Sequence, residues 1–140
     1  MKEKNMTKQE TLITVLLDKL TVTDAAKVPV YDPEQIQDGT GVVTAEIGRI
    51  EPMNPGLPDY RVTVSIMGQT FSADDPDREK FQTLAEECLR SVEAWTPAEL
   101  AAAAGESIVG KFLKGMDNSS DGNENQFKID LELIISDWIF

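Results

Sequence analysis

Apolar and polar residues alternate most regularly between Tyr60 and Gln69. Four apolar residues fall on one face of this extended segment: Tyr60, Val62, Val64 and Ile66. The opposite face carries Arg61, Thr63, Ser65 and Gln69. A period of two is typical of a strand that buries one face and exposes the other. The segment therefore predicts a half-buried β-strand.

Three further segments carry strand signals. Residues 42–50 alternate with Val43, Ala45 and Ile47 inward, and Gly48 is expected to weaken the end of that strand. Residues 108–113 and 126–136 are predicted as the last two strands. The final one has inward apolar residues at every second position: Phe127, Ile129, Leu131, Leu133 and Ile135. The first two strands are predicted to pair antiparallel.

Helix signals precede three apolar stripes. Residues 7–10 have the S/T-x-x-E form of a capping box, and leucines and an isoleucine follow at helical spacing. The Asp-Asp-Pro-Asp segment at 74–77 offers capping carboxylates, with the proline suited to the first turn of a helix that continues to Trp95. Residues 96–105 restart a short helix behind a Thr-Pro cap, and a glycine ends it.

The segments between these elements are polar and rich in proline or glycine. Residues 21–41 and 51–59 are predicted as long loops, and residues 117–125 as a polar hairpin tip. Residues 1–140 are expected to form a single domain in which residues 1–6 are flexible. The predicted fold class is α+β: a mostly antiparallel four-stranded sheet with helices packed on one face, in the order α-β-β-α-(α)-β-β.

Charge and composition narrow the function. The chain has 25 Asp and Glu against 13 Lys and Arg, a formal net charge of -12, and no histidine. Direct binding to a phosphate backbone needs clustered basic residues, so no direct nucleic-acid binding is expected and partners are expected to be proteins. His-dependent catalysis and His-ligated metal sites are excluded. The single cysteine, Cys88, lies on an apolar helix position and is expected to be a buried thiol.

Two acidic clusters are candidates for a cation or catalytic site. Asp74, Asp75 and Asp77 are the densest group, and their place before a helix favours capping over chemistry. Residues 117–122 resemble the start of a calcium loop, but Lys128 stands at position twelve, where a bidentate glutamate is required. No nucleotide-binding glycine motif is present. The sequence therefore predicts a protein with no catalytic, cofactor-binding or metal-binding residues, and not an enzyme.

The last three residues, Trp138, Ile139 and Phe140, are large and apolar. They are expected either to complete the core or to form a docking patch for a partner. Other apolar residues in the predicted loops join them as candidate interface residues: Met53, Leu57 and Tyr31. The N-terminus lacks an apolar signal core, and no apolar run reaches the ~20 residues that cross a bilayer, so a cytoplasmic protein without a membrane segment is expected.

The order of these features resembles small proteins of tailed phages and prophages. The strand at 59–66, the acidic segment at 74–77 and the helix to Trp95 are similar to tail-terminator or head-tail connector (minor tail) proteins. A glycine-rich third strand, a polar loop and the final strand at 127–133 extend the resemblance over residues 7–137. The shared features are patterns of polarity rather than chemical signatures.

This resemblance implies a non-enzymatic structural subunit. Such a protein forms a ring, often a hexamer, that caps the tail tube and offers a surface to the head connector. It would occur in the cytoplasm of the bacterial host and in the virion. Acidic charge suits a ring through whose lumen DNA passes, because a basic lining would retain the DNA. The long loops and the apolar C-terminus are the contact elements expected in such a ring.

Three rival functions remain open. A small acidic secretion-type chaperone that binds a protein partner is the main alternative, although such chaperones usually end with a helix. An acidic mimic of DNA would need carboxylates spaced along one face like phosphates. A carboxylate enzyme would need a concave pocket and a carboxyl group with a raised pKa near Asp74 or Asp75.

Overall fold

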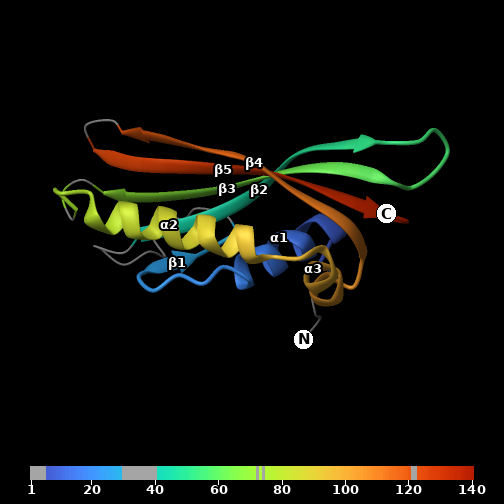
Figure 1. Ribbon diagram of the computed structural model, residues 1–140, viewed down its shortest axis with the longest axis horizontal. Coiled ribbons are helices and arrows are strands. Elements are labelled where there is room, and N and C mark those ends of the chain that lie inside the picture. The colour runs from blue at the N-terminus through green and yellow to red at the C-terminus, as the bar shows by residue number, and fades with distance from the viewer. Residues whose placement is uncertain (1–5, 30–40, 72, 74, 121–122) are drawn as a thin grey trace.

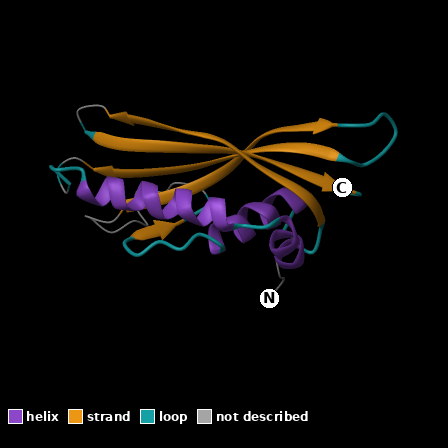
Figure 2. Ribbon diagram, viewed as in Figure 1, coloured by secondary structure: helices purple, strands orange, loops and turns teal. Residues whose placement is uncertain are grey.

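The structure, a computed structural model, describes residues 6–29, 41–71, 73, 75–120 and 123–140. Its helices are α1 (Lys8–Asp18), α2 (Glu79–Ala94) and α3 (Pro97–Ala104). Its strands are β1 (Ala25–Lys27), β2 (Gly41–Pro52), β3 (Tyr60–Phe71), β4 (Ser107–Ser120) and β5 (Glu124–Ser136). The strands form one sheet in the order β1-β2-β3-β5-β4, and the helices lie on one side of it (Figures 1 and 2). The α+β class is confirmed.

The sheet has five strands within the described residues, so the prediction of four is wrong. The additional strand, β1, lies inside the 21–41 segment predicted as a loop, and it pairs parallel to β2 over Gly41–Val43. Its sequence, Ala-Ala-Lys, has neither alternation nor β-branched residues. The strand exists because its backbone pairs with a distant segment, which no local pattern reports. Residues 30–40, including Tyr31, lie outside the described residues.

The strands are also longer than their apolar patterns. β2 runs to Pro52 and β3 begins at Tyr60, so the predicted 51–59 loop shortens to a turn in which the Met53 N–H donates to the Asp59 carbonyl over 3.0 Å. Gly48 does not end β2. It lies where the register shifts between Ile47 and Arg49, which is a β-bulge.

The predicted polar tip at 117–125 is mostly strand. β4 continues through Ser120 and β5 begins at Glu124, with Ser120 opposite Asn125. The residues of β4 beyond Leu113 are mostly exposed, and polar side chains carry no alternation signal there. Pairing with β5 forms the ladder, so this half of the strand depends on its neighbour rather than on its own sequence. Residues 121 and 122 lie outside the described part.

The core lies between the sheet and the helices. Buried apolar side chains come from every second position of β3 and β5 and from the inner faces of α1 and α2. Thr7 caps α1 by accepting from the Glu10 N–H at 3.1 Å, and Thr96 caps α3 by accepting from the Glu99 N–H at 3.2 Å. Gly105 ends α3 with φ 69°, a left-handed conformation that suits glycine. The predicted caps of these two helices are confirmed.

The sheet has two ends, which close differently. The tail end is the end where β2 and β5 finish and β3 and β4 begin, and its paired row is Pro52, Tyr60, Ile135 and Ile108. The tip end is the opposite one, with the paired row Val42, Gln69, Gln126 and Ser119. In Figure 1 the C-terminus and the turn between β2 and β3 lie together at the tail end.

Candidate protein-interaction surface

The C-terminal residues close the tail end with a cluster of aromatic rings. The Trp138 side chain is fully buried, and its ring centroid lies 6.2 Å from that of Tyr60 and 4.6 Å from that of Phe140. The Tyr60 and Phe140 centroids are 5.6 Å apart. Offset and edge-to-face contacts at these distances stabilise aromatic clusters beyond simple burial. Trp138 therefore belongs to the core, one of the two roles that the sequence left open.

Asp59 fastens the chain that leads into this cluster. One oxygen, Oδ1, accepts from the Ser136 hydroxyl and from the Asp137 N–H, both at 3.0 Å. The Asp137 N–H, followed by the Ser136 hydroxyl, holds the pKa of the Asp59 carboxyl below its ordinary value. The Trp138 N–H donates to the Pro58 carbonyl at 2.7 Å. The turn between β2 and β3 and the C-terminal residues thus form one structural unit.

The other candidate interface residues remain exposed on that unit. Ile139 is 59% and Phe140 65% exposed, so both present apolar surface beyond the buried tryptophan. Met53 and Leu57 are 40% and 55% exposed on the turn that Trp138 contacts through Pro58. The structure thus brings five of the six predicted interface residues to the tail end. The sixth, Tyr31, is not among the described residues.

The edge strand β4 adds exposed apolar residues that the sequence did not single out. Val109 is 62%, Phe112 53% and Leu113 36% exposed. The Phe112 ring packs over the backbone of Gly110, where a Cβ would come within 3.1 Å of it. The region is a predicted strand, but its position at an edge follows from the strand order alone. The sequence signal for an irregular strand here was the pair of glycines, Gly110 and Gly115, which lie at register shifts between β4 and β5.

Lys111 fixes this half of β4 to the helical layer. Its Nζ donates to the Val92 carbonyl at 2.6 Å and to the Glu93 carbonyl at 3.2 Å, both at the C-terminus of α2. Burial lowers the pKa of the ammonium, and the neighbouring Glu93 and Glu99 partly oppose that shift. A cation at this position also complements the helix dipole. These hydrogen bonds therefore fix the position of the part of β4 that carries the exposed apolar side chains.

The outer face of the sheet, opposite the helices, carries charged and hydroxyl side chains. Glu132 forms ion pairs with both Arg61 and Lys114, the latter at 3.1 Å. The Ser65 hydroxyl donates to Asp130 at 2.8 Å. These pairs join three neighbouring strands across one face. The face is polar at its centre, so the exposed apolar surface is concentrated at the tail end and along β4.

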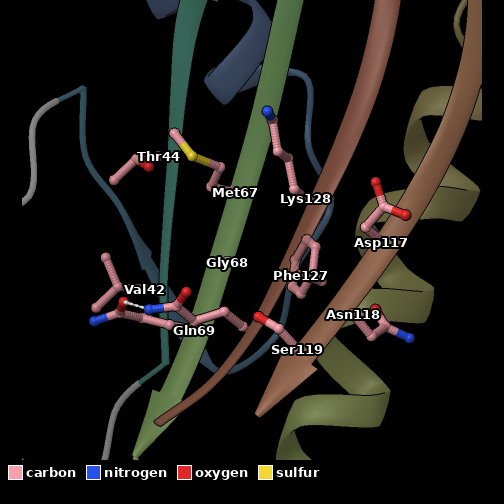
Figure 3. A pocket seen from close by; sticks show the side chains of 11 residues that line it. Val42, Thr44, Met67, Gly68, Gln69, Asp117, Asn118, Ser119, Phe127 and Lys128 are labelled. Carbon is pink, nitrogen blue, oxygen red and sulfur yellow. Dashed lines mark hydrogen bonds between the residues drawn. The ribbon is translucent and has the colours of Figure 1, made fainter. Parts of the chain in front are cut away.

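A hollow of about 340 Å³ lies on this sheet at its tip end (Figure 3). Its walls are two successive rows of outward side chains and the backbone between them. One row is Thr44, Met67, Lys128 and Asp117, and the other is Val42, Gln69, Gln126 and Ser119. The lining offers amides, hydroxyls and one residue of each charge. It does not bring together the paired carboxylates that acid-base catalysis would use.

Over residues 117–120, the part of the calcium-loop pattern that the structure describes, no loop forms. Asp117, Asn118, Ser119 and Ser120 lie in extended strand, where consecutive side chains point to opposite faces. A calcium loop needs its oxygen ligands to converge on one ion. Among the described residues, no group of three or more acidic or cysteine side chains is arranged to hold a metal ion.

Asp75 has a structural role. Its two oxygens accept from the Phe81 N–H at 2.9 Å, the Lys80 N–H at 3.0 Å and the Thr70 hydroxyl at 3.0 Å. Burial raises the pKa of this carboxyl, but the hydrogen bonds from Phe81, Lys80 and Thr70 together bring it below its ordinary value. The predicted capping role is confirmed, although α2 begins at Glu79 rather than at Pro76. Asp74 is not described, and Asp77 is exposed.

The thiol of Cys88 is buried in the core, as expected. Burial, with a smaller contribution from Glu87, raises its pKa to about 12, while Lys27 opposes the shift. A thiol with such a pKa is protonated near neutral pH and is a poor nucleophile.

Comparison with known proteins does not assign the chain to a family. No protein-family model matches the chain, and no curated protein matches it. In the described part of the chain, no helix is both long and apolar enough to span a bilayer.

Proposed function

We propose that this protein is a non-enzymatic structural subunit of a tailed phage or prophage that assembles with copies of itself into a ring and caps the tail tube. The observation that carries this proposal is the edge strand β4, which exposes Val109, Phe112 and Leu113 along an unshared side of the sheet in the described residues. Exposed apolar side chains beside free backbone groups are typical of a surface that pairs with another chain.

The exposed tail end supports a second contact. Phe140, Ile139 and Leu57 present apolar side chains at one end of the sheet, away from the outer charged face. In a ring whose strands run roughly along its axis, one end of each sheet faces an axial neighbour. The tail end would then dock onto the tail tube or the head connector protein. Such a protein would act in the host cytoplasm and in the virion.

The buried carboxylate and the buried thiol, the two side chains that could most readily take part in catalysis, instead stabilise the fold. Asp75 uses both oxygens on hydrogen bonds at the start of α2, and Cys88 is a buried, protonated thiol. The carboxyl pKa of Asp75 is shifted downward, opposite to the direction that a general acid requires. These observations support a binding role over the carboxylate-enzyme alternative.

The secretion-type chaperone remains the alternative function. Its acidic charge and α+β fold match, but this chain ends with a long strand and an aromatic cluster rather than a helix. The two functions differ in the assembly that they require. A chaperone of this type acts as a dimer with one isologous interface, whereas a ring needs a heterologous one.

Light scattering across a protein concentration series, with negative-stain imaging of the largest species, tests the proposal. We expect a closed ring of about five to seven copies, the range that cyclic symmetry and the phage resemblance indicate. A discrete dimer would favour the chaperone. A monomer at every concentration, with no ring on added tail tubes, would contradict the proposed assembly.

A further inference from the structure

We propose that the subunits join edge to edge: β4 of one copy pairs antiparallel with the Thr44–Pro52 segment of β2 in the next copy, so that the sheet continues across the subunit boundary. This inference depends on the self-assembly proposed above. It specifies which two surfaces meet, in which direction and in which register. It is carried by the free edges of the sheet and by the side chains beside them.

Both edges have an unshared side within the described residues. β1 shields β2 only at Gly41–Val43, extended by a hydrogen bond from the Val28 N–H to the Val43 carbonyl at 3.0 Å. From Thr44 to Pro52, no described strand pairs with that side of β2. β4 pairs with β5 on one side, and no described strand pairs with its other side. Free strand edges are templates for pairing with another chain.

The free part of β2 lies level with the apolar part of β4. Strand pairing across the sheet places Arg49 in the same row as Phe112, and Ile47 in the same row as Leu113. The shielded residue Val43 shares its row with Asn118, in the polar half of β4. β1 therefore pairs with β2 only in those rows of the sheet in which β4 carries polar residues.

The strand directions fit a head-to-tail arrangement. β2 is antiparallel to β3, β3 to β5, and β5 to β4, so β2 and β4 run in opposite directions at the two edges. Copies related by rotation about a ring axis keep the same orientation. Placing β4 of one copy beside β2 of the next then produces an antiparallel pair, the direction already used by most of this sheet.

Side chains on the two edges complement each other in shape. A groove of about 510 Å³ lies between α1 and β2, with Ile13, Ala45 and Ile47 in its wall. The rest of its lining is Met6, Pro29 and the polar residues Gln9, Glu10 and Thr14. Leu113 lies on the helix-facing side of β4, opposite Leu131, and is 36% exposed. In the level register, Leu113 of the neighbouring copy enters this groove beside Ile47. The apolar side of the groove at one edge thus receives an apolar side chain from the other edge.

The outer-face side chains complement each other in charge. In the same register, Phe112 of one copy lies opposite Arg49 of the next, whose side chain is 73% exposed. An arginine over an aromatic ring is a favourable pair. Lys114, beside Gly115 in the row of Glu46, would then face that exposed carboxylate. In this register Asn118 and Ser119 share the rows of Val43 and Val42, where β1 already pairs with β2, so the neighbouring β4 must turn away from β2 beyond Asp117.

Cysteine pairs test this arrangement on the full-length protein. Arg49→Cys and Phe112→Cys are made as separate proteins, mixed and gently oxidised. Only cysteines whose Cα atoms lie within about 7 Å are joined, so a covalent heterodimer reports the pairing directly. We expect the heterodimer in the mixture and no dimer from either variant alone. The matched control replaces Phe112→Cys by Ser119→Cys, on the same face of the same strand, and is expected to give none.

A second pair, Glu46→Cys with Lys114→Cys, guards against loss of assembly through the Phe112 change. Light scattering on each mixture records assembly separately. Assembled rings in which neither pair forms a heterodimer would overturn this interface while leaving the proposed function intact. Absence of rings from the wild type and from every variant, with and without added tail tubes, would overturn both the interface and the proposed function. Equal cross-linking through Ser119→Cys would overturn the register.

Discussion

The two ends of the sheet are closed by opposite chemistry. At the tip end, Thr70, Asp75 and Asn125 are buried polar residues joined by hydrogen bonds, with Asn125 Nδ2 donating to the Thr70 hydroxyl at 3.4 Å. At the tail end, the rings of Tyr60, Trp138 and Phe140 pack together, and their outermost member is 65% exposed. At the tip end these three polar side chains bond to one another, whereas the tail end leaves apolar surface uncovered.

This difference separates stability from association. A buried polar network must be complete within one chain, because each unpaired member costs free energy. Exposed apolar side chains contribute little to the stability of a single chain, but burying them against a partner contributes favourable free energy to association. Changes at the tip end should therefore alter unfolding alone. Changes to exposed side chains at the tail end and on the adjoining half of β4 should alter assembly.

The largest expected effect is the loss of the Trp138 ring. Because the side chain is fully buried, Trp138→Ala should lower the free energy of unfolding by about 3–5 kcal/mol. Urea unfolding at several protein concentrations measures it, and the loss should not depend on concentration. An unchanged midpoint would show that the ring does not belong to the core of the subunit.

Asp75→Asn should lower the free energy of unfolding by about 2–3 kcal/mol at neutral pH, since the amide cannot accept all three hydrogen bonds. The pKa of this carboxyl lies below its ordinary value in the native state, so its contribution is fully present above the unfolded-state pKa and is lost as the pH falls through the native pKa. Urea unfolding at a series of pH values measures both, and the difference between wild type and variant should shrink in acid.

Asp77→Asn is the matched control, because Asp77 is exposed two residues away. Its effect on unfolding should stay within about 0.5 kcal/mol. Equal effects of the two substitutions would remove the distinction between a capping carboxylate and a solvated one. Self-association of both variants should equal that of the wild type.

Gly68→Ala should lower the free energy of unfolding by about 2 kcal/mol, because a Cβ at residue 68 would overlap the ring of Phe127 in the paired position of β5. The ring is buried and cannot move aside at low cost. Gly48→Ala is the control: its added methyl group would lie 3.9 Å from the nearest atom, the Thr63 carbonyl oxygen. Thermal unfolding should separate the two, and equal melting temperatures would refute the packing argument.

A smaller effect on unfolding than those of Trp138→Ala, Asp75→Asn and Gly68→Ala is expected from deleting Ile139 and Phe140. Both are more than half exposed, and the main loss is the Phe140 contact with Trp138, worth about 1 kcal/mol. Binding to an axial partner should fall much more, which pull-down with tail tubes would measure. A large loss of stability with unchanged binding would move these residues from the docking surface to the core.

Much of the fold could be predicted from local pattern, and the candidate surface only in part. β3 and β5 alternate over most of their length, and Thr7 and Thr96 are recognisable caps. β1 and the outer half of β4 have no such pattern, because pairing with distant strands creates them. The exposed residues of β4 were missed for the same reason: strand order decides which strand is an edge.

The C-terminal tripeptide shows a finer limit. Trp138, Ile139 and Phe140 are alike in composition, yet one is fully buried and the others are exposed. Asp137 adopts φ 54° just before them, and its N–H donates a hydrogen bond to the carboxylate of Asp59. That turn directs the tryptophan inward. A residue 78 positions away thus determines the division between core and surface, which sequence reasoning left open.

The edge-to-edge interface is tested by comparing two lysine substitutions on one strand. Phe112→Lys and Ser119→Lys add the same charge to the same face of β4, in its apolar half and its polar half respectively. Sedimentation velocity measures their assembly against the wild type. We expect Ser119→Lys to assemble like the wild type and Phe112→Lys to remain a folded monomer. Equal assembly of the two variants, or loss in Ser119→Lys alone, would contradict this interface.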